Sequence, residues 1–176
     1  MLQYRDKTRD AARRSREACG LAAICEAFDV PLIINDDVEL AHASLAAGVH
    51  LGEDDDDIAA ARAVLGTNAI IGVSCYDSLQ RARDAAAAGA DYLAFGAFFP
   101  SITKPGARHA KTDLLRDARE FGLPLVAIGG ITTENGRSLI AAGADYLAVI
   151  SALFGASDVR VAAQRFAALF ERQDSE

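Results

Sequence analysis

The sequence predicts an α/β fold in which strand–helix units follow one another along a single domain spanning residues 1–176. Short apolar runs alternate with longer alanine-rich stretches, which is typical of a parallel sheet covered by helices. Polar residues gather immediately after the apolar runs, and the strands lack a Rossmann glycine fingerprint. Both features favour a (β/α)8 TIM barrel over a doubly wound sheet, because a barrel keeps its functional site at the carboxyl ends of its strands.

Seven apolar runs are predicted to form the strands. Most of them are continuous rather than alternating, as in residues 31–34 (PLII), so both faces of these strands are expected to be buried. The runs are Leu2–Arg5, Pro31–Asn35, Gly48–Gly52, Ala69–Ser74, Asp91–Gly96, Leu123–Gly130 and Asp145–Ser151.

The stretches between the strands carry apolar residues at helical spacing. In the first stretch these positions are Ala11, Ala18, Ala22, Cys25 and Phe28. The predicted helices are Thr8–Phe28, Asp37–Ala47, Asp56–Leu65, Ser78–Ala88, Lys111–Glu120, Thr133–Ala142 and Asp158–Phe170.

An internal repeat supports this alternation. The segment Ala87–Ala94 (AAGADYLA) recurs unchanged at Ala141–Ala148, and a weaker echo lies at Ala46–Leu51. Glycine readily takes the left-handed conformation that often ends a helix. The repeat therefore predicts a helix that stops at a glycine and leads directly into a strand.

The number of strands is one short of a complete barrel. A (β/α)8 barrel has eight strands and typically about 250 residues, whereas this sequence shows seven predicted strands in 176 residues. The chain also begins inside a strand. Either one leading strand–helix unit lies upstream of Met1, or the protein is a reduced barrel. We favour the first interpretation and expect an N-terminally short barrel.

The composition excludes several classes of protein. Lysine and arginine number 18 against 25 aspartates and glutamates, a net charge of −7, so a nucleic-acid partner is not expected. Hydrophobic residues make up 51% of the chain, which excludes disorder. The longest charge-free run is about 14 residues, whereas a membrane span needs ~20. The absence of an export signal, and of metal or disulfide spacing, indicates a cytoplasmic protein whose Cys19, Cys25 and Cys75 are buried or half-buried.

Three polar side chains alternate at the end of the first strand. Gln3, Arg5 and Lys7 lie two residues apart, so they are expected to share one face. Two cations and an amide suit a multiply charged anion such as a diphosphate. A solvated edge strand would give the same pattern, so spacing alone leaves both interpretations open.

Carboxylates follow the next two strands. Asn35 and Asp36 close one strand, and the acidic run Glu53–Asp57 follows the other. Two carboxylates on neighbouring loops can share Mg²⁺, which takes oxygen ligands and usually bridges to substrate phosphate. Aspartates at helix starts also act as caps, and most of the run is expected to do so.

Weaker phosphate-binding features follow later strands. Ser74 ends one strand, Phe99–Gly106 combines hydroxyls, a lysine and a glycine turn, and Gly129-Gly130 follows a third strand. Each of these also occurs in ordinary turns. Packing or surface roles are expected for the histidines, which are His42, His50 and His109.

Taken together, these motifs resemble the thiamine-phosphate synthase (thiamine-phosphate pyrophosphorylase) family over essentially the whole chain. The matching motifs are Gln3–Lys7, Ile34–Asp36, Gly48–Asp55, Gly72–Ser74, Pro100–Lys104 and Ala127–Ile131. The resemblance implies a (β/α)8 barrel and a transferase that uses Mg²⁺. Its expected substrates are small molecules, 4-amino-5-hydroxymethyl-2-methylpyrimidine diphosphate and a thiazole phosphate, which give thiamine phosphate and pyrophosphate. The sequence leaves a homo-oligomer open.

The resemblance also implies roles for single residues. In the family the diphosphate is thought to leave first, and the expected catalytic residues are Arg5, Lys7, Ser74 and Lys104. The expected Mg²⁺ ligands are Asp36 and Asp55. The pyrimidine diphosphate is expected on Gln3, Arg5, Lys7, Asn35, Ser74 and Lys104. The thiazole phosphate is expected on Ser101, Ile102, Thr103, Gly130, Ile150 and Ser151.

The sequence departs from the family's pattern in three respects. The first strand and helix have no counterpart, Ser101 stands where threonine is usual, and Glu53 stands where glutamine is usual. Two alternatives stand beside the synthase, a thiazole tautomerase-like isomerase and an inactive truncated homologue. The tautomerases tend to lose the metal carboxylates and carry a histidine where this chain has Tyr76, whereas Asp36 and Asp55 are retained here.

Overall fold

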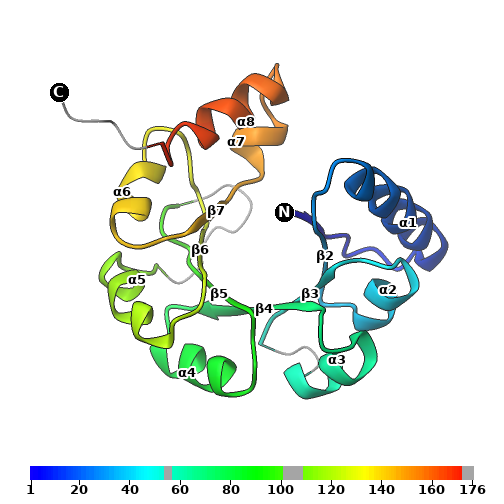
Figure 1. Ribbon diagram of the computed structural model, residues 1–176. Helices are drawn as coiled ribbons and strands as arrows, with labels where there is room; N and C mark the ends of the chain where they lie inside the picture. Colours follow the sequence, from blue (N-terminus) through cyan, green and yellow to red (C-terminus); the bar gives the residue numbers. More distant parts are fainter. Residues whose placement is uncertain (54–56, 101–108, 172–176) are drawn as a thin grey trace. The chain divides into compact units, whose positions relative to one another are not determined.

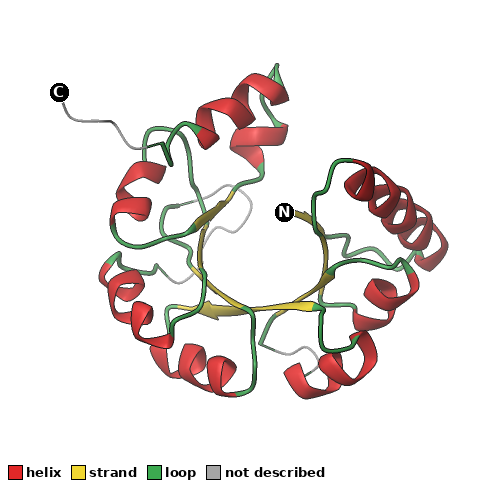
Figure 2. Cartoon of the chain, in the orientation of Figure 1, coloured by secondary structure: helices red, strands yellow, loops and turns green. Residues whose placement is uncertain are grey.

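The computed structural model of the chain describes residues 1–53, 57–100 and 109–171, and it confirms the alternation of strands and helices (Figure 1, Figure 2). The seven predicted strands are all present, and the part of the chain that is described contains no eighth. They follow one another in the sheet in chain order, and the pairs β1–β2, β2–β3, β3–β4, β5–β6 and β6–β7 are parallel. The strands are β1 (Leu2–Tyr4), β2 (Leu32–Asn35), β3 (Gly48–Leu51), β4 (Ile70–Tyr76), β5 (Tyr92–Phe95), β6 (Leu125–Ile128) and β7 (Tyr146–Ala148).

Helices occupy the stretches between the strands, as predicted. A short helix, α7, directly after β7 was not predicted. No helix in the described ranges is long and apolar enough to cross a membrane. The helices are α1 (Ala11–Ala27), α2 (Val38–Ala43), α3 (Ile58–Leu65), α4 (Leu79–Ala87), α5 (Asp113–Ala118), the 3₁₀ helix η1 (Arg119–Phe121), α6 (Gly136–Ala141), α7 (Ser151–Phe154) and α8 (Val159–Ala167).

Five predicted strands end earlier in the structure than expected. β3 and β5 each stop one residue short, at Leu51 and Phe95. β1 ends at Tyr4, so Arg5 lies just beyond it. β6 ends at Ile128, because Gly129 and Gly130 take φ angles of 93° and 63°, outside the strand region. β7 ends at Ala148, and Ser151 begins α7 instead of closing the strand.

Two compact units make up the chain. The first unit comprises Met1–Ser74 and Asp84–Tyr92, and the second comprises Cys75–Arg83 and Leu93–Glu176. The first unit therefore holds β1, β2, β3 and most of β4, whereas the second holds β6, β7 and most of β5.

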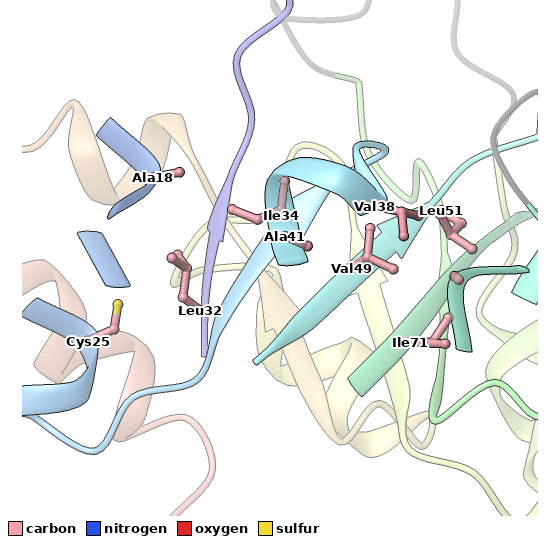
Figure 3. Close-up of a cluster of buried hydrophobic side chains, with 10 residues drawn as sticks. Ala18, Cys25, Leu32, Ile34, Val38, Ala41, Val49, Leu51 and Ile71 are labelled. Carbon is pink, nitrogen blue, oxygen red and sulfur yellow. The ribbon is translucent and has the colours of Figure 1, made fainter. Parts of the chain in front are cut away.

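The hydrophobic core of the first unit lies between its strands and α1, α2 and α3 (Figure 3). The helices contribute mainly small side chains, which let them pack closely against the larger aliphatic side chains of the strands. Leu2 and Tyr4 of β1 pack against this core. Its buried members are Ala18, Cys25, Leu32, Ile34, Val38, Ala41, Val49, Leu51, Ala61 and Ile71.

The alternation of side chains along each strand separates this core from a polar face. Side chains of successive strand residues point to opposite sides of a sheet. Since Ile34, Val49 and Ile71 face the helices, their neighbours on the same strands lie on the opposite face. The residues placed there are Gln3, Ile33, Asn35, Gly48, His50, Gly72 and Ser74.

Helix ends confirm the predicted glycine stops at Gly89 and Gly143, which take φ angles of 92° and 116°. In the weaker echo the left-handed residue is Leu45, with a φ of 56°, whereas Gly48 lies inside β3. The backbone bonds are nonetheless equivalent: Ala46 N donates to Ala41 O, as Ala90 N donates to Ala85 O. The helix stop in the echo is therefore displaced from its glycine, and Leu45 occupies a position that favours glycine.

The aspartate of each repeat copy joins two strands. Both the amide N–H and the carboxylate of Asp91 bond the backbone of Ile71, and the carboxylate also accepts from Arg62 at 2.7 Å. Asp145 bonds Leu125 in the same way, and its carboxylate accepts from Arg119 at 3.1 Å. The first set of bonds lies within the first unit and the second within the second unit.

The cysteines only partly match the prediction. Cys25 and Cys75 are buried, whereas Cys19 is exposed on α1. Burial raises the pKa of the Cys75 thiol to about 12. This thiol is therefore protonated at neutral pH and acts as a small apolar side chain.

Candidate active site

The first unit brings together polar residues from the carboxyl ends of neighbouring strands. Gln3 lies in β1, Asn35 closes β2, and Ser74 lies near the end of β4, all on the sheet face opposite the helices. Asn35 is the register partner of His50 in β3, and His50 is the register partner of Gly72 in β4. Parallel strands thus place these side chains at one edge of the sheet, where barrels bind substrates.

The predicted alternation of Gln3, Arg5 and Lys7 is confirmed. These three side chains are exposed, whereas Leu2, Tyr4 and Asp6 between them are half-buried. The alternation continues beyond β1 because the side chains of Tyr4 and Asp6 are held by hydrogen bonds to α1 and to the loop before it. Arg5 and Lys7 therefore lie on the exposed side of this segment.

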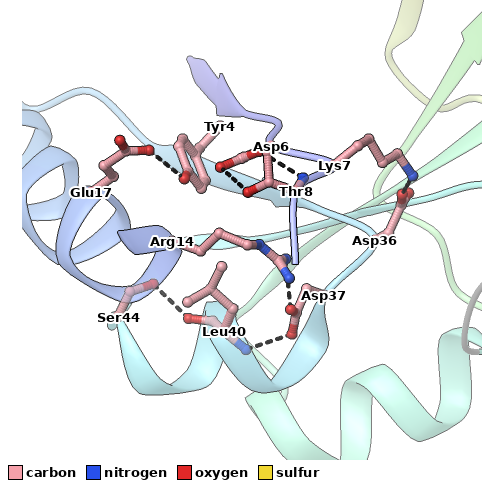
Figure 4. Close-up of polar contacts among 10 residues, drawn as sticks. All are labelled: Tyr4, Asp6, Lys7, Thr8, Arg14, Glu17, Asp36, Asp37, Leu40 and Ser44. Carbon is pink, nitrogen blue, oxygen red and sulfur yellow. Dashed lines mark hydrogen bonds and ion pairs between the residues drawn. The ribbon is translucent and has the colours of Figure 1, made fainter. Parts of the chain in front are cut away.

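Tyr4 and Asp6 anchor the segment that carries the cations (Figure 4). The Tyr4 hydroxyl donates to Glu17 of α1 at 2.7 Å, and burial together with this carboxylate raises the pKa of Tyr4 to about 12. Asp6 accepts from the Thr8 amide at 2.8 Å and from the Arg13 guanidinium, which lowers the pKa of Asp6 to about 2. Asp6 is therefore an anchor for the loop.

Lys7 and Asp36, predicted to bind different parts of a metal–diphosphate group, are in direct contact. The Lys7 ammonium donates to the Asp36 carboxylate, as Figure 4 shows. Asp36 takes a left-handed φ of 66°, and its amide donates to the His50 carbonyl at 2.8 Å. The Asp36 side chain keeps 22% of its surface exposed, so solvent and ligands can reach it.

The adjacent Asp37 has a different role. Its carboxylate caps α2 by accepting from the Leu40 amide at 2.8 Å, and it also accepts from Arg14 at 2.7 Å (Figure 4). Asp57 likewise caps α3, as expected for the acidic run. The structure thus separates the two cap aspartates from Asp36, whose carboxylate accepts from Lys7.

His50, for which the sequence suggested packing or a surface role, is the centre of a buried hydrogen-bonded chain. Its Nδ1 lies 2.9 Å from the Tyr92 hydroxyl and its Nε2 lies 2.8 Å from Ser74 Oγ. The two rings are stacked with centroids 5.5 Å apart. The Gln3 side chain also hydrogen-bonds the Tyr92 hydroxyl. Two predicted substrate residues, Gln3 and Ser74, are therefore linked through two residues that sequence reasoning missed.

Burial controls the protonation of this chain. His50 is 7% exposed, and burial lowers its pKa to about 4, although the nearby Asp36 carboxylate opposes that shift. Burial also raises the pKa of Tyr92 well above its usual range. At neutral pH the chain therefore consists of neutral groups. Strand alternation could have identified His50 as a candidate site residue, because position 50 shares a sheet face with Asn35 and Ser74.

The second unit holds the other described candidates, Gly130, Ile150 and Ser151. A Cβ on Gly130 would lie 2.5 Å from the Pro100 carbonyl oxygen, so this turn packs too tightly for any other residue. The Gly130 carbonyl accepts from Asn135 at 3.0 Å, which fixes the loop after β6. Ile150 and Ser151 are exposed after β7.

Five predicted residues lie outside the described part of the chain. One is the second metal carboxylate, and the others belong to the predicted phosphate loop. They are Asp55, Ser101, Ile102, Thr103 and Lys104. Among the residues that are described, no three His, Cys, Asp or Glu side chains gather closely enough to hold a metal ion by themselves.

The fold and the first unit's polar edge define a parallel α/β protein whose polar side chains gather toward the carboxyl ends of its strands, where barrel enzymes carry their active sites. Comparison with known proteins identifies the family. Residues 1–153 match the family described as thiamine monophosphate synthase, and the chain belongs to it. It is accordingly a transferase of thiamine phosphate synthesis.

Known relatives resemble the chain over nearly its full length. It is 59% identical over 171 residues to the thiamine-phosphate synthase of an Azoarcus species, covering 97% of this chain and 83% of that one. It is 57% identical over 169 residues to the thiamine-phosphate synthase of Xanthomonas campestris pv. campestris, covering 96% and 82%. The structure of a thiamine phosphate pyrophosphorylase from Pyrococcus furiosus matches with a TM-score of 0.86 and 36% identity, covering 95% of this chain and 80% of that one.

Proposed function

We propose that this thiamine-phosphate synthase binds the pyrimidine diphosphate on Gln3, Arg5, Lys7, Asn35 and Ser74, with Lys104 from outside the described residues. The observation that carries the assignment is the common placement of Gln3, Asn35 and Ser74 on the same sheet face of β1, β2 and β4. Amide and hydroxyl groups there can bond phosphate oxygens, and the exposed Arg5 and Lys7 supply positive charge beside them.

The reaction needs charge stabilisation more than acid–base chemistry. The bond between the pyrimidine methylene carbon and the diphosphate oxygen breaks, and its electron pair leaves with the oxygen. The thiazole nitrogen then supplies the electron pair of the new carbon–nitrogen bond. Arg5, Lys7 and the Ser74 hydroxyl act by stabilising the charge that develops on the leaving diphosphate, an electrostatic contribution that is usually the largest in catalysis.

The donor set is compatible with Mg²⁺. In enzymes that bind phosphates this ion commonly uses one or two carboxylates and completes its shell with water and phosphate oxygens. Asp36 is a partly exposed carboxylate, and Asp55 would be the second ligand. When bound, Mg²⁺ would neutralise part of the diphosphate charge. Lys7 in turn holds the Asp36 carboxylate through their ion pair.

The thiazole phosphate is assigned to Gly130, Ile150 and Ser151 of the second unit, with Ser101, Ile102 and Thr103. Support comes from the Gly129-Gly130 turn directly after β6, because glycine backbone can approach a phosphate closely and both glycines are only half-buried. Residues 1–176 would act as one catalytic domain of the (β/α)8 barrel type, and the described residues form seven of its strands. It would work on small molecules in the cytoplasm, alone or as a homo-oligomer.

Two adjacent aspartates provide the test of the metal and diphosphate assignment. Asp36→Asn removes the charged oxygen donor, whereas Asp37→Asn keeps a capping side chain and serves as the matched control. Thiamine phosphate would be measured from both substrates over a series of Mg²⁺ concentrations. We expect Asp36→Asn to raise the half-saturating Mg²⁺ concentration at least tenfold, with little change in Asp37→Asn.

A cation variant completes this test. Lys7→Ala should lower kcat roughly 10²–10³-fold if Lys7 acts on the developing charge, and the exposed Arg9→Ala should leave kcat unchanged. Equal behaviour of Asp36→Asn and Asp37→Asn, or a normal kcat in Lys7→Ala, would contradict the site assignment while leaving the family membership intact.

A further inference from the structure

The chain Gln3–Tyr92–His50–Ser74 has both of its ends on the proposed diphosphate site. Tyr92 and His50, in the middle, are 5% and 7% exposed, so they can reach substrate only through their two neighbours. Buried polar groups of this kind are costly unless each donor meets an acceptor. The direction of any one hydrogen bond therefore determines the direction of the others, from Gln3 to Ser74.

A neutral histidine allows two such orders, since one ring nitrogen donates and the other accepts. In the first order Gln3 donates to Tyr92, Tyr92 donates to Nδ1 of His50, and Nε2–H donates to Ser74 Oγ. In the second order every bond is reversed, and the Ser74 hydroxyl donates to His50. The two orders differ in where the hydrogen of Ser74 points.

An anionic substrate distinguishes the two orders. Diphosphate oxygens accept hydrogen bonds but donate none, so Ser74 binds them only as a donor. That requirement excludes the second order, in which His50 occupies the Ser74 hydrogen. The Gln3 side chain hydrogen-bonds the Tyr92 hydroxyl, and its amide N–H can supply the donor that the first order needs.

We propose that His50 is a positioning residue which, as the neutral tautomer with hydrogen on Nε2, holds Ser74 as a donor to the leaving diphosphate. The inference rests on the proposed diphosphate site at Ser74. No proton is transferred: His50 fixes the Ser74 oxygen as an acceptor of Nε2–H, and Tyr92 fixes the tautomer by donating to Nδ1. Preorganised donors of this kind stabilise charge in a transition state without reorienting.

Amide variants of His50 test the two ring nitrogens separately. In His50→Gln the amide nitrogen reaches the position of Nε2 and can still donate to Ser74, whereas the shorter His50→Asn replaces only Nδ1. We expect kcat to fall less than tenfold in His50→Gln, and about 10–10²-fold in His50→Asn, approaching the 10²–10³-fold loss typical of a missing donor, expected for Ser74→Ala. The exposed His42→Asn is the matched control and should not change kcat.

Non-additive losses of kcat in a double variant would distinguish the positioning of Ser74 by His50 from a general structural effect of replacing His50. If His50 acts through Ser74, the double variant Ser74→Ala/His50→Asn should be no slower than Ser74→Ala alone. Multiplied losses in the double variant, or equal losses in His50→Gln and His50→Asn, would overturn the proposal.

Side-chain ¹⁵N NMR of wild-type protein provides a measurement independent of turnover. With inorganic pyrophosphate and MgCl₂ added, the proposal requires hydrogen on Nε2 of His50, and a spectrum showing hydrogen on Nδ1 would overturn it. Wild-type turnover of both substrates tests the proposed function separately. If the protein forms no thiamine phosphate but shows the Nε2–H tautomer, the proposed function is refuted and the positioning role of His50 is retained.

Discussion

A Cβ atom on Gly72 would lie 1.9 Å from Cζ of Tyr92. Gly72 is the register partner of His50 in the neighbouring strand. The Tyr92 ring occupies the space that a side chain at position 72 would need, and from there its hydroxyl reaches His50 at 2.9 Å. Gly72 is therefore required for the contact between β3 and β5 side chains.

Gly72→Ala should consequently displace Tyr92. Overpacking of this kind costs about 1–3 kcal/mol of stability, and loss of the Tyr92 contact should reduce turnover as His50→Asn does. The control is Gly20→Ala within α1, where a Cβ meets nothing within 4 Å and should stabilise by about 0.5–1 kcal/mol. Urea unfolding of both variants measures the difference, and equal stability of the two would contradict the steric argument.

Leu45→Gly is expected to stabilise the protein. Leu45 adopts a φ of 56° and is 87% exposed, so glycine relieves backbone strain while little apolar contact is lost. Left-handed geometry costs a non-glycine residue about 1–2 kcal/mol, and the greater freedom of glycine in the unfolded chain offsets part of the gain. We expect a net increase of about 1 kcal/mol by urea unfolding. Leu45→Ala retains a Cβ and should show no gain.

His50 should make stability depend on pH between about 4 and 6.5. The folded pKa is about 4 against an ordinary value of 6.5, so in this range the unfolded chain binds a proton that the folded chain does not. Stability therefore falls as the pH is lowered from 7 to 4, by at most about 3 kcal/mol. Asp6, with its pKa lowered to about 2, contributes only in more acidic solution.

Urea unfolding at several pH values checks the His50 prediction. The slope between pH 4 and 6.5 should be smaller in His50→Gln than in wild type. It should persist in His42→Asn, which replaces an exposed histidine of α2. A slope that survives His50→Gln would assign the pH dependence to other groups.

The two repeat aspartates should have similar energetic roles. Asp91→Ala and Asp145→Ala each leave a strand N–H, that of Ile71 or Leu125, without its carboxylate acceptor, and each should cost about 1–3 kcal/mol. Asp91→Asn and Asp145→Asn keep an oxygen acceptor and lose only a partly exposed ion pair, so they should cost less than about 1 kcal/mol. Equal losses for alanine and asparagine would show that the arginine contact dominates.

The sequence predicted the strand pattern well because continuous apolar runs are a strong local signal. Leu32–Asn35 and Leu125–Ile128 lie within predicted strands. The ends were less predictable, since Gly129 and Gly130 turn the chain through conformations that composition does not specify. Leu45 could not be identified as a helix stop, because leucine seldom adopts the left-handed conformation that it has here.

The candidate site likewise has a part that local sequence patterns predict and a part that they do not. The alternation of Gln3, Arg5 and Lys7 is a local pattern, and the structure confirms their shared exposure. The His50 contacts join residues 24 and 42 positions apart, so no local motif contains them. Residues from three strands must be aligned in register before His50 meets Tyr92 and Ser74. Their roles in binding substrate stay predictions until the variants are measured.

The paired bonds of Asp91 and Asp145 also bear on how the chain acquires its fold. Each carboxylate reaches back to a strand only 20 residues earlier, so a strand is secured as soon as the next unit has been synthesised. Contacts of such short sequence separation close small loops, which form quickly and at modest entropic cost. The order of strands in the sheet equals their order of synthesis, and the protein is therefore suited to fold unit by unit as it leaves the ribosome.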